Sequence, residues 1–227
     1  LTVMAVHNHY PKAAVMTGLP DESFIRADIP MTKREIRASV VSRLSPAKDA
    51  IVYDIGAGTG SVSVELAMHA LYGTVYAVER TKEGCELIAQ NARKFGLDNI
   101  DIINASAADV IEKLPAADSV FIGGSGGELE KIMDIVLKKN PGVHIVITAV
   151  TLETLNDSVR LMEDKKVDVI DIVQIAVTQI KKRGRYHMLA ANNLLLKEEV
   201  TDESSHDSCY RQWKRQNNYC MRLMPVY

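Results

Sequence analysis

Short apolar runs alternate with longer amphipathic segments over most of the chain, from about residue 50 to residue 164. The apolar runs are rich in β-branched residues and predict strands at Ile51–Ile55, Thr74–Glu79, Ile100–Asn104, Ser119–Ile122 and Val143–Thr148. The amphipathic segments predict helices at Ser61–Leu71, Glu83–Phe95, Ala108–Leu114, Glu128–Lys139 and Leu152–Asp164. Regular alternation of this kind is typical of an α/β fold, in which helices cover both faces of a mostly parallel sheet.

One more helix is expected before the first strand, from about Lys33 to Leu44. Thr32 and Glu35 have the spacing of a capping box, and Pro46 follows the expected end. The pattern therefore predicts a helix that starts at a side-chain cap.

Two long apolar runs, Val167–Ile180 and Tyr186–Leu196, follow the last of these helices. The turn-like segment Lys181–Arg185 separates them. We interpret the pair as an antiparallel hairpin that closes one edge of the sheet and brings it to seven strands.

The length of 227 residues fits one main hydrophobic core. We expect a single domain over residues 18–196, preceded by a linker (residues 1–17) and followed by a tail of different composition (residues 197–227). Because the first residue is Leu1 rather than methionine, we expect the chain to be part of something longer.

Charge and cysteine content narrow the function classes. The net charge is −2, so no basic field favours nucleic acid or a membrane surface, and no apolar stretch approaches the 18 residues of a membrane span. Cys85, Cys209 and Cys220 are an odd number at no metal-ligand spacing. This favours a small-molecule ligand, no metal site and a reducing, cytoplasmic location.

A glycine-rich turn, Asp54–Gly60, follows the first strand. Gly56, Gly58 and Gly60 let the backbone bend sharply and approach a ligand closely. Asp54 would repel a pyrophosphate at the following helix, whereas the ammonium and sulfonium of S-adenosylmethionine suit a carboxylate. A helix-capping role for Asp54 is the structural alternative.

Glu79 ends the second strand, about 20 residues beyond the turn, where a carboxylate can accept hydrogen bonds from both ribose hydroxyls. This supports an adenosine ligand without separating the methyl donor from a nicotinamide. Taken alone, Glu79 could equally be a solvated strand end.

A second glycine cluster, Gly123, Gly124, Ser125, Gly126 and Gly127, follows the fourth strand. A simple strand-to-helix turn needs only one or two glycines, so four of them favour a ligand-binding loop.

Three segments, Pro30–Arg37, Asp54–Gly60 and Phe121–Glu128, together resemble the precorrin-6B methyltransferase (decarboxylating) family of cobalamin biosynthesis. The resemblance extends from about Gly18 to Asn193 and implies a Rossmann-like class I methyltransferase that uses S-adenosylmethionine. It also implies methylation of a tetrapyrrole at ring carbon 15, with decarboxylation of the acetate on ring C. Members of the family are often tetrameric and often form the C-terminal module of a bifunctional precorrin-6Y C5,15-methyltransferase, so a homo-oligomer and a fused N-terminal partner module are expected.

The resemblance also implies the residues of the site. Cofactor contacts fall on Thr32, on the turn residues Gly56, Ala57, Gly58, Thr59 and Gly60, on Glu79 and on Ala107. The family commonly has Gly-Asp-Ala-Pro where this chain has Ala105–Ala108, so the Ser106 hydroxyl or the backbone would replace an acidic contact to the adenine amino group. A further departure is the tail of about 30 residues that separates Asn193 from the terminal Pro-Val-Tyr.

The loop Gly123–Gly127 is expected to lie against the macrocycle, and a basic residue, Arg37, to meet one of its carboxylates. Lys33, Arg34 and the cluster Lys181–Arg185 are further candidates for that contact. No catalytic acid or base is assigned, although Glu35, Glu128 and His187 are candidates. The alternatives are a methyltransferase for RNA or another small molecule, a nicotinamide-dependent oxidoreductase, and a cofactor-binding subunit without activity of its own.

Overall fold

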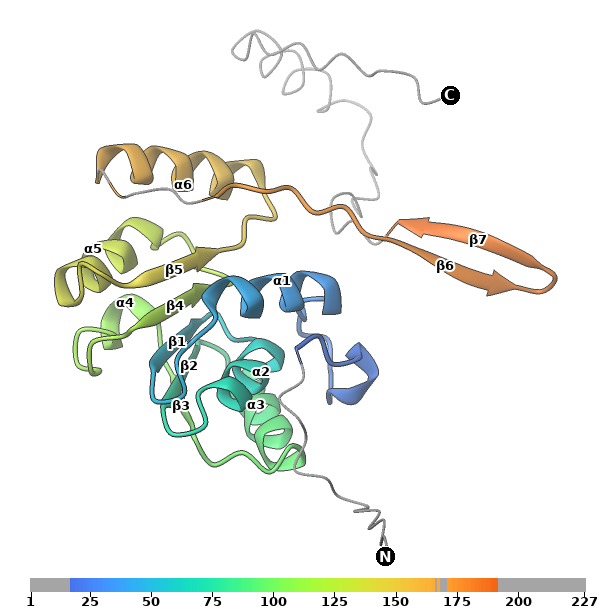
Figure 1. The fold of residues 1–227 in the computed structure, drawn as a ribbon, viewed down its shortest axis with the longest axis horizontal. Coiled ribbons are helices and arrows are strands. Elements are labelled where there is room, and N and C mark those ends of the chain that lie inside the picture. Colours follow the sequence, from blue (N-terminus) through green and yellow to red (C-terminus); the bar gives the residue numbers. More distant parts are fainter. Residues whose placement is uncertain (1–16, 166, 168–170, 192–227) are drawn as a thin grey trace, which may run out of the picture. The chain divides into compact units, whose positions relative to one another are not determined.

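The computed structural model describes residues 17–165, 167 and 171–191. Its centre is a five-stranded parallel sheet with the strand order β3-β2-β1-β4-β5 (Figure 1). The strands are β1 (Ile51–Ile55), β2 (Thr74–Glu79), β3 (Ile100–Asn104), β4 (Ser119–Ile122) and β5 (His144–Ile147). Their predicted positions are confirmed, with β5 one residue shorter at each end.

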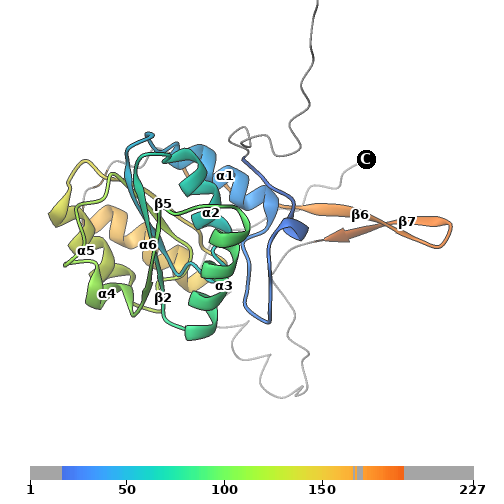
Figure 2. The ribbon, with the colours of Figure 1, turned by 90° about the horizontal axis from the view of Figure 1, so that it is seen from below.

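The helices are α1 (Arg34–Leu44), α2 (Ser61–His69), α3 (Lys82–Lys94), α4 (Ala107–Val110), α5 (Leu129–Lys139) and α6 (Leu152–Asp164), with a short 3₁₀ helix at Asp21–Ser23. Figure 2 shows α1, α2 and α3 on one side of the sheet and α4, α5 and α6 on the other. The predicted α/β fold is therefore confirmed.

The side chains of β1 alternate between the two faces of the sheet and so belong to both hydrophobic clusters of the core. Tyr53 and Ile55 pack with α4 and α5, whereas Val52 packs with α1 and α2. Successive residues of a strand point to opposite faces, so Asp54 belongs to the face that α2 covers. This places the first residue of the glycine turn next to a helix rather than in solvent.

The expected antiparallel hairpin is present, but it does not join the edge of the large sheet. β6 (Thr178–Arg183) and β7 (Tyr186–Ala191) pair antiparallel, but they form a two-stranded sheet of their own. Gly184, with φ of 61°, opens a two-residue turn, and the two strands pair with each other over six residue pairs. The large sheet therefore has five strands, not seven, and no antiparallel edge; residues 168–170 and 192–196 of the predicted runs lie outside the described residues.

The predicted capping box is wrong. Lys33 is the N-cap residue of α1, and no side chain caps this helix. Since the helix begins one residue later than the box requires, the Thr32 hydroxyl does not reach the free amides.

A buried ion pair holds the segment before α1 against the domain. Arg37 Nε donates to Glu65 Oε1 at 2.6 Å, and neither side chain is exposed to solvent. The Glu65 carboxylate also accepts the backbone N–H groups of Gly18 and Leu19, at 2.8 and 2.9 Å. The guanidinium donates to the carbonyl of Thr32 and lies 4.5 Å from the centre of the Phe24 ring.

We expect Arg37→Met to lower the free energy of unfolding by about 3–5 kcal/mol, because it leaves the Glu65 carboxylate buried without its cation. Urea denaturation followed by circular dichroism measures the change. Arg34→Met is the matched control on the exposed side of α1 and should change stability by less than about 0.5 kcal/mol. Equal stability of the Arg37 variant and the wild type would contradict this role.

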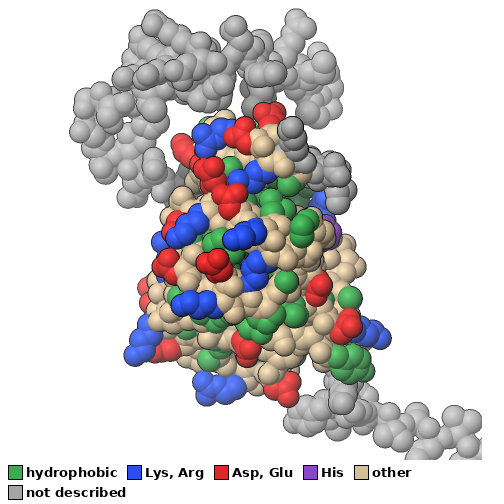
Figure 3. Space-filling model, turned by 90° about the vertical axis from the view of Figure 1, so that its left-hand side faces the viewer, with side chains coloured by type: hydrophobic (Ala, Val, Ile, Leu, Met, Phe, Trp, Pro, Cys, Tyr) green, Lys and Arg blue, Asp and Glu red, His purple; other side chains and the backbone are tan. Residues whose placement is uncertain are grey.

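The surface carries both signs of charge. Figure 3 shows basic and acidic side chains interspersed over one face of the molecule, with no extended field of a single sign on that face. None of the helices in the described part of the chain has the length and apolar character needed to cross a bilayer. Of the predicted linker (residues 1–17), only Thr17 is described, and the predicted tail (residues 197–227) lies outside the described residues.

Candidate functional site

The glycine turn between β1 and α2 has three residues in the left-handed region. The φ values of Gly56, Gly58 and Gly60 are 73°, 55° and 75°. A Cβ at Gly56 would lie 2.5 Å from the carbonyl oxygen of Gly124, so a side chain here would collide with the second glycine loop. The turn is also fixed to β2, because the N–H groups of Gly56 and Ala57 donate to the Val78 carbonyl.

Asp54 is fully buried beneath this turn. Its Oδ2 accepts a hydrogen bond of 2.5 Å from Ser63 Oγ on α2, whereas Oδ1 has no donor among the described residues. Burial raises the pKa of Asp54 from 3.8 to about 7; the Ser63 hydrogen bonds oppose this rise and the Glu79 charge adds to it. The carboxyl group therefore gains from any ligand that brings a cation or an N–H donor.

Thr59 provides a second buried polar atom at the turn. Its Oγ1 also finds no hydrogen-bond partner in the described part of the chain. Buried polar groups without partners are uncommon and cost about 1–3 kcal/mol each. Two of them within six residues fit a site that is completed by a polar ligand.

Glu79 lies beside the turn, as the strand order requires. Its Oε2 accepts from the Gly58 N–H at 2.9 Å, and its Oε1 accepts from the N–H and hydroxyl of Thr81, at 2.8 and 2.9 Å. The structure therefore brings Asp54, the glycine turn and Glu79 together at the carboxyl ends of β1 and β2. Ligands of open α/β sheets bind at this end of the strands.

The loop after β3 joins the same edge. The Ala105 N–H donates to the Glu79 carbonyl at 3.1 Å, and the Ser106 hydroxyl donates to Glu128 Oε2. Ala107 is buried at the start of α4. Glu128 thus places a carboxylate beside the loop Ala105–Ala108, whose own sequence contains no acidic residue.

The second glycine loop packs against the first. The N–H groups of Gly123 and Gly124 donate to the Ile55 carbonyl, at 2.9 and 3.3 Å. Gly126 and Gly127 have φ values of 59° and 86°, and they lead the chain into Glu128. Ser125 accepts the Glu128 N–H through its carbonyl, at 3.1 Å, so the loop closes as a turn.

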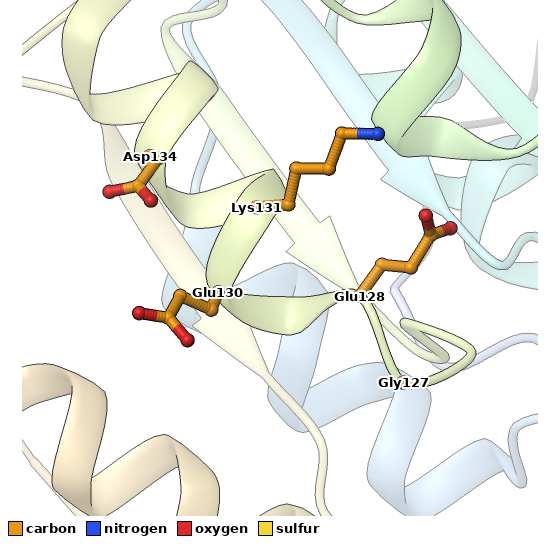
Figure 4. Close-up of a pocket in the computed structure, with 5 residues that line it drawn as sticks. All are labelled: Gly127, Glu128, Glu130, Lys131 and Asp134. Carbon is orange, nitrogen blue, oxygen red and sulfur yellow. The ribbon is translucent and has the colours of Figure 1, made fainter.

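A hollow of about 400 Å³ borders the end of this loop and is lined by Gly127, Glu128, Glu130, Lys131 and Asp134. Figure 4 shows the ends of Glu128 and Lys131 extending toward α4, whereas Glu130 and Asp134 point away from it. Lys131 pairs with Asp109 of α4 at 3.5 Å. A lining made mostly of charged side chains does not suit a flat conjugated ligand, so we place the candidate site at the glycine turns.

The segment before α1 also reaches the glycine turn. A Cβ at Gly58 would lie 3.1 Å from the carbonyl oxygen of Pro30, which precedes Thr32 by two residues. Arg37 is placed elsewhere. Its guanidinium is fully buried with Glu65 and offers no surface to a substrate, so it is not part of the candidate site.

The other charged residues that were predicted for the site are paired elsewhere, exposed or outside the described side chains. Lys33 lies 4.0 Å from Asp21, and Arg34 and Glu35 are exposed on the first turn of α1. The side chains of His187 and of residues 181–183 are not among those that the structure describes. Within the described residues no cluster of His, Cys, Asp and Glu could hold a metal ion, and Cys209 and Cys220 lie outside them.

The sequence patterns did not predict the positions of three residues at this edge of the sheet, namely Ser63, Arg80 and Glu128. Ser63 lies one helical turn beyond Gly60, and this spacing could have indicated its bond to Asp54. Arg80 directly follows the strand-end Glu79, which is a position that faces ligands in α/β folds. Glu128 meets Ser106 across 22 residues of sequence, and no local pattern signals that pairing.

Comparison with known proteins gives a consistent set of matches. A family model described as "Precorrin methyltransferase domain" matches residues 23–201. A probable cobalt-precorrin-6B C(15)-methyltransferase (decarboxylating) from Pyrobaculum calidifontis is 38% identical over 179 residues, which are 78% of this chain and 91% of the relative.

Two solved structures are similar as well. A precorrin-6y C5,15-methyltransferase from Geobacter metallireducens matches with a TM-score of 0.73 and 36% identity, covering 81% of this chain and 93% of that one. A precorrin 8w decarboxylase from Methanobacterium thermoautotrophicum matches with a TM-score of 0.72 and 32% identity, covering 77% of this chain and 95% of that one.

Proposed function

Because the chain belongs to the precorrin methyltransferase family, we propose that it methylates a precorrin or cobalt-precorrin at ring carbon 15, using S-adenosylmethionine, and decarboxylates the acetate side chain of ring C. The observation that carries this proposal is the buried Asp54 carboxylate, with an oxygen that lacks a donor, beneath a glycine turn that Glu79 flanks. A cationic amino acid attached to a nucleoside matches this arrangement, and a dinucleotide pyrophosphate does not.

The residues present fit this cofactor. Asp54 would pair with its ammonium, and the Thr59 hydroxyl would gain a partner at the same turn. Glu79 would accept the ribose hydroxyls, and the base would extend toward Ser106 and Ala107. When bound, S-adenosylmethionine supplies the methyl group as a cation-activated electrophile.

The chain's own contribution to methyl transfer is alignment and the exclusion of water. The loop Gly123–Gly127 contacts the first glycine turn through Gly56, so a macrocycle lying on this loop would be held beside the cofactor. Decarboxylation needs an electron sink, and the conjugated ring of the substrate can serve as one. The residues of the two glycine turns therefore position the substrate rather than attack it.

Two measurements test the proposal. Calorimetric titration should show binding of S-adenosylhomocysteine and no binding of NAD. Turnover of precorrin-6B or its cobalt form, followed by mass spectrometry, should show gain of a methyl group and loss of carbon dioxide in the same product. Tight binding of NAD, or methylation without decarboxylation, would contradict the assignment.

Glu128 gives a separate prediction about the adenine base. Its Oε2 is bonded to Ser106, and its other oxygen has no donor within the described part of the chain, so it can accept the adenine amino group. We expect the wild type to bind S-adenosylhomocysteine at least about tenfold more tightly than S-inosylhomocysteine, which has a carbonyl there instead.

Glu128→Gln should reduce this preference, because an amide can also donate to the carbonyl. Glu130→Gln is the matched control, since Figure 4 shows Glu130 pointing away from α4, and it should leave the ratio unchanged. An unchanged ratio in the Glu128 variant would remove Glu128 from the base-binding site.

A further inference from the structure

Arg80 is held at the tip of β2, directly after Glu79. The carbonyl of Arg80 accepts a hydrogen bond of 2.9 Å from Asn104 Nδ2, and that of Glu79 accepts one of 3.1 Å from the same amide. Asn104 ends the neighbouring strand β3, so two strand ends fix the backbone from which the Arg80 side chain extends. The side chain is exposed at the carboxyl edge of the sheet.

The guanidinium of Arg80 lies against the second glycine loop. A Cβ at Gly126 would come within 2.6 Å of the Arg80 Cζ and 2.7 Å of its Nη1, so the guanidinium lies directly against Gly126. Gly126 has φ of 59°, which also favours glycine. β1 lies between β2 and β4 in the sheet, so this contact extends from the tip of β2, past the end of β1, to the loop that follows β4.

Arg80 has no ion-pair partner among the described residues, although other cations of the domain do. Lys131 pairs with Asp109, Lys33 with Asp21, and Arg37 with the buried Glu65. A guanidinium that extends from a fixed strand end over the glycine loop and lacks an anion is available to a carboxylate ligand, which it can bind through two parallel hydrogen bonds.

We propose that Arg80 binds a side-chain carboxylate of the tetrapyrrole substrate and orients the macrocycle on the loop Gly123–Gly127. The proposal rests on the proposed function, because it takes the substrate to be a carboxylate-rich macrocycle that lies on this loop. It replaces Arg37, which the sequence favoured for this contact and which is buried in the fold.

The test compares Arg80→Gln, Arg80→Lys and Arg93→Gln in the full chain. Arg93 is an exposed arginine of α3 whose Nε donates to the Ala89 carbonyl on its own helix, so Arg93→Gln is the matched control. The measurements are KM and kcat for precorrin-6B or its cobalt form, and the dissociation constant of S-adenosylhomocysteine by calorimetry.

Arg80→Gln should raise KM for the macrocycle by about tenfold or more, while the affinity for S-adenosylhomocysteine stays within about twofold of the wild type. Arg80→Lys should recover only part of the loss, because a lysine retains the charge but not the planar fork. Arg93→Gln should match the wild type in all three measurements.

An unchanged KM in Arg80→Gln would overturn the proposal. A parallel loss of S-adenosylhomocysteine affinity would overturn it too, because the guanidinium would then act on the cofactor. Failure of the proposed function itself looks different: the wild type would then neither bind S-adenosylhomocysteine nor turn over the macrocycle.

Discussion

Asp54→Asn is expected to make the protein more stable and a weaker binder of its cofactor at the same time. The carboxyl group is fully buried, and its pKa is raised from 3.8 to about 7, chiefly by burial. Above pH 7 the folded protein therefore holds a buried charge that costs free energy. An amide keeps the shape of the side chain and removes that cost.

The sign of the pH dependence follows from proton binding. Between about pH 4 and pH 7 the folded state keeps the Asp54 proton, whereas the unfolded chain has lost it. The free energy of unfolding contributed by this group is therefore greatest at low pH, falls as pH rises through this window, and is smallest above pH 7. At pH 8 we expect Asp54→Asn to raise the free energy of unfolding by about 2 kcal/mol, and at pH 4 to leave it nearly unchanged.

Cofactor binding should respond in the opposite direction. The ammonium of S-adenosylhomocysteine needs the ionised carboxylate, so the wild-type affinity should fall by about tenfold between pH 8 and pH 6. In Asp54→Asn the affinity at pH 8 should be about thirtyfold lower, equivalent to about 2 kcal/mol, and should no longer depend on pH across this range.

Calorimetry and urea denaturation at pH 6 and pH 8 measure both effects. Adenosine, which lacks the amino acid part, is the control ligand, and its affinity should not differ between the two proteins. If Asp54→Asn binds S-adenosylhomocysteine as tightly as the wild type, the carboxylate does not meet the ammonium. Loss of adenosine binding would instead indicate that the substitution had disturbed the whole turn.

The strands and their order along the chain could be predicted because local sequence patterns indicate them. β1, β2 and β3 are short runs of β-branched and aliphatic residues bounded by turn residues, and their limits were predicted to the residue. The glycine turn and the strand-end Glu79 were also recognisable, since the spacing along the chain maps onto neighbouring parallel strands.

Pairings between distant segments could not be predicted in the same way. Whether the β6 and β7 hairpin joins the large sheet depends on edge contacts that no local pattern encodes, and here the two strands pair only with each other. The Ser106 to Glu128 bond likewise depends on how two loops meet, not on either sequence alone.

Arg37 is a different case, because a signal was present. It lies four residues before Val41 and seven before Leu44, so it belongs to the apolar stripe of α1 that faces the core. A charged residue in such a stripe needs a buried partner, and Glu65 occupies the corresponding place within the apolar helix α2. The positions of Arg37 and Glu65 in these two helices together predict an ion pair instead of a substrate contact.

Gly56→Ala is expected to weaken cofactor binding by at least about a hundredfold. The φ of Gly56 is 73°, and an added Cβ would lie 2.5 Å from the carbonyl oxygen and 2.8 Å from the nitrogen of Gly124. These are backbone atoms that cannot rotate away, so the two glycine loops must separate. The N–H groups of Gly56 and Ala57, which fix the turn to Val78, would move with them.

Two other glycines separate the causes of this effect. Gly127→Ala places an alanine at φ of 86°, but with no atom within 4 Å of the new Cβ, so it introduces backbone strain without a collision. Gly142→Ala has no positive φ, and its nearest contact, at 3.5 Å from Asn140 Oδ1, is ordinary. Both controls should keep the wild-type affinity for S-adenosylhomocysteine, and Gly127→Ala alone of the two should lose about 1–2 kcal/mol of stability.

Calorimetry with S-adenosylhomocysteine should therefore show at least about a hundredfold loss for Gly56→Ala, equivalent to about 3 kcal/mol. Circular dichroism shows whether the variant still has its sheet and helices. If the folded Gly56→Ala variant retained the wild-type affinity, the cofactor could not lie on this turn, and the roles of Asp54 and Glu79 would have to be withdrawn with it. If Gly127→Ala lost affinity to the same degree, strain in the second loop, and not contact between the two loops, would control binding.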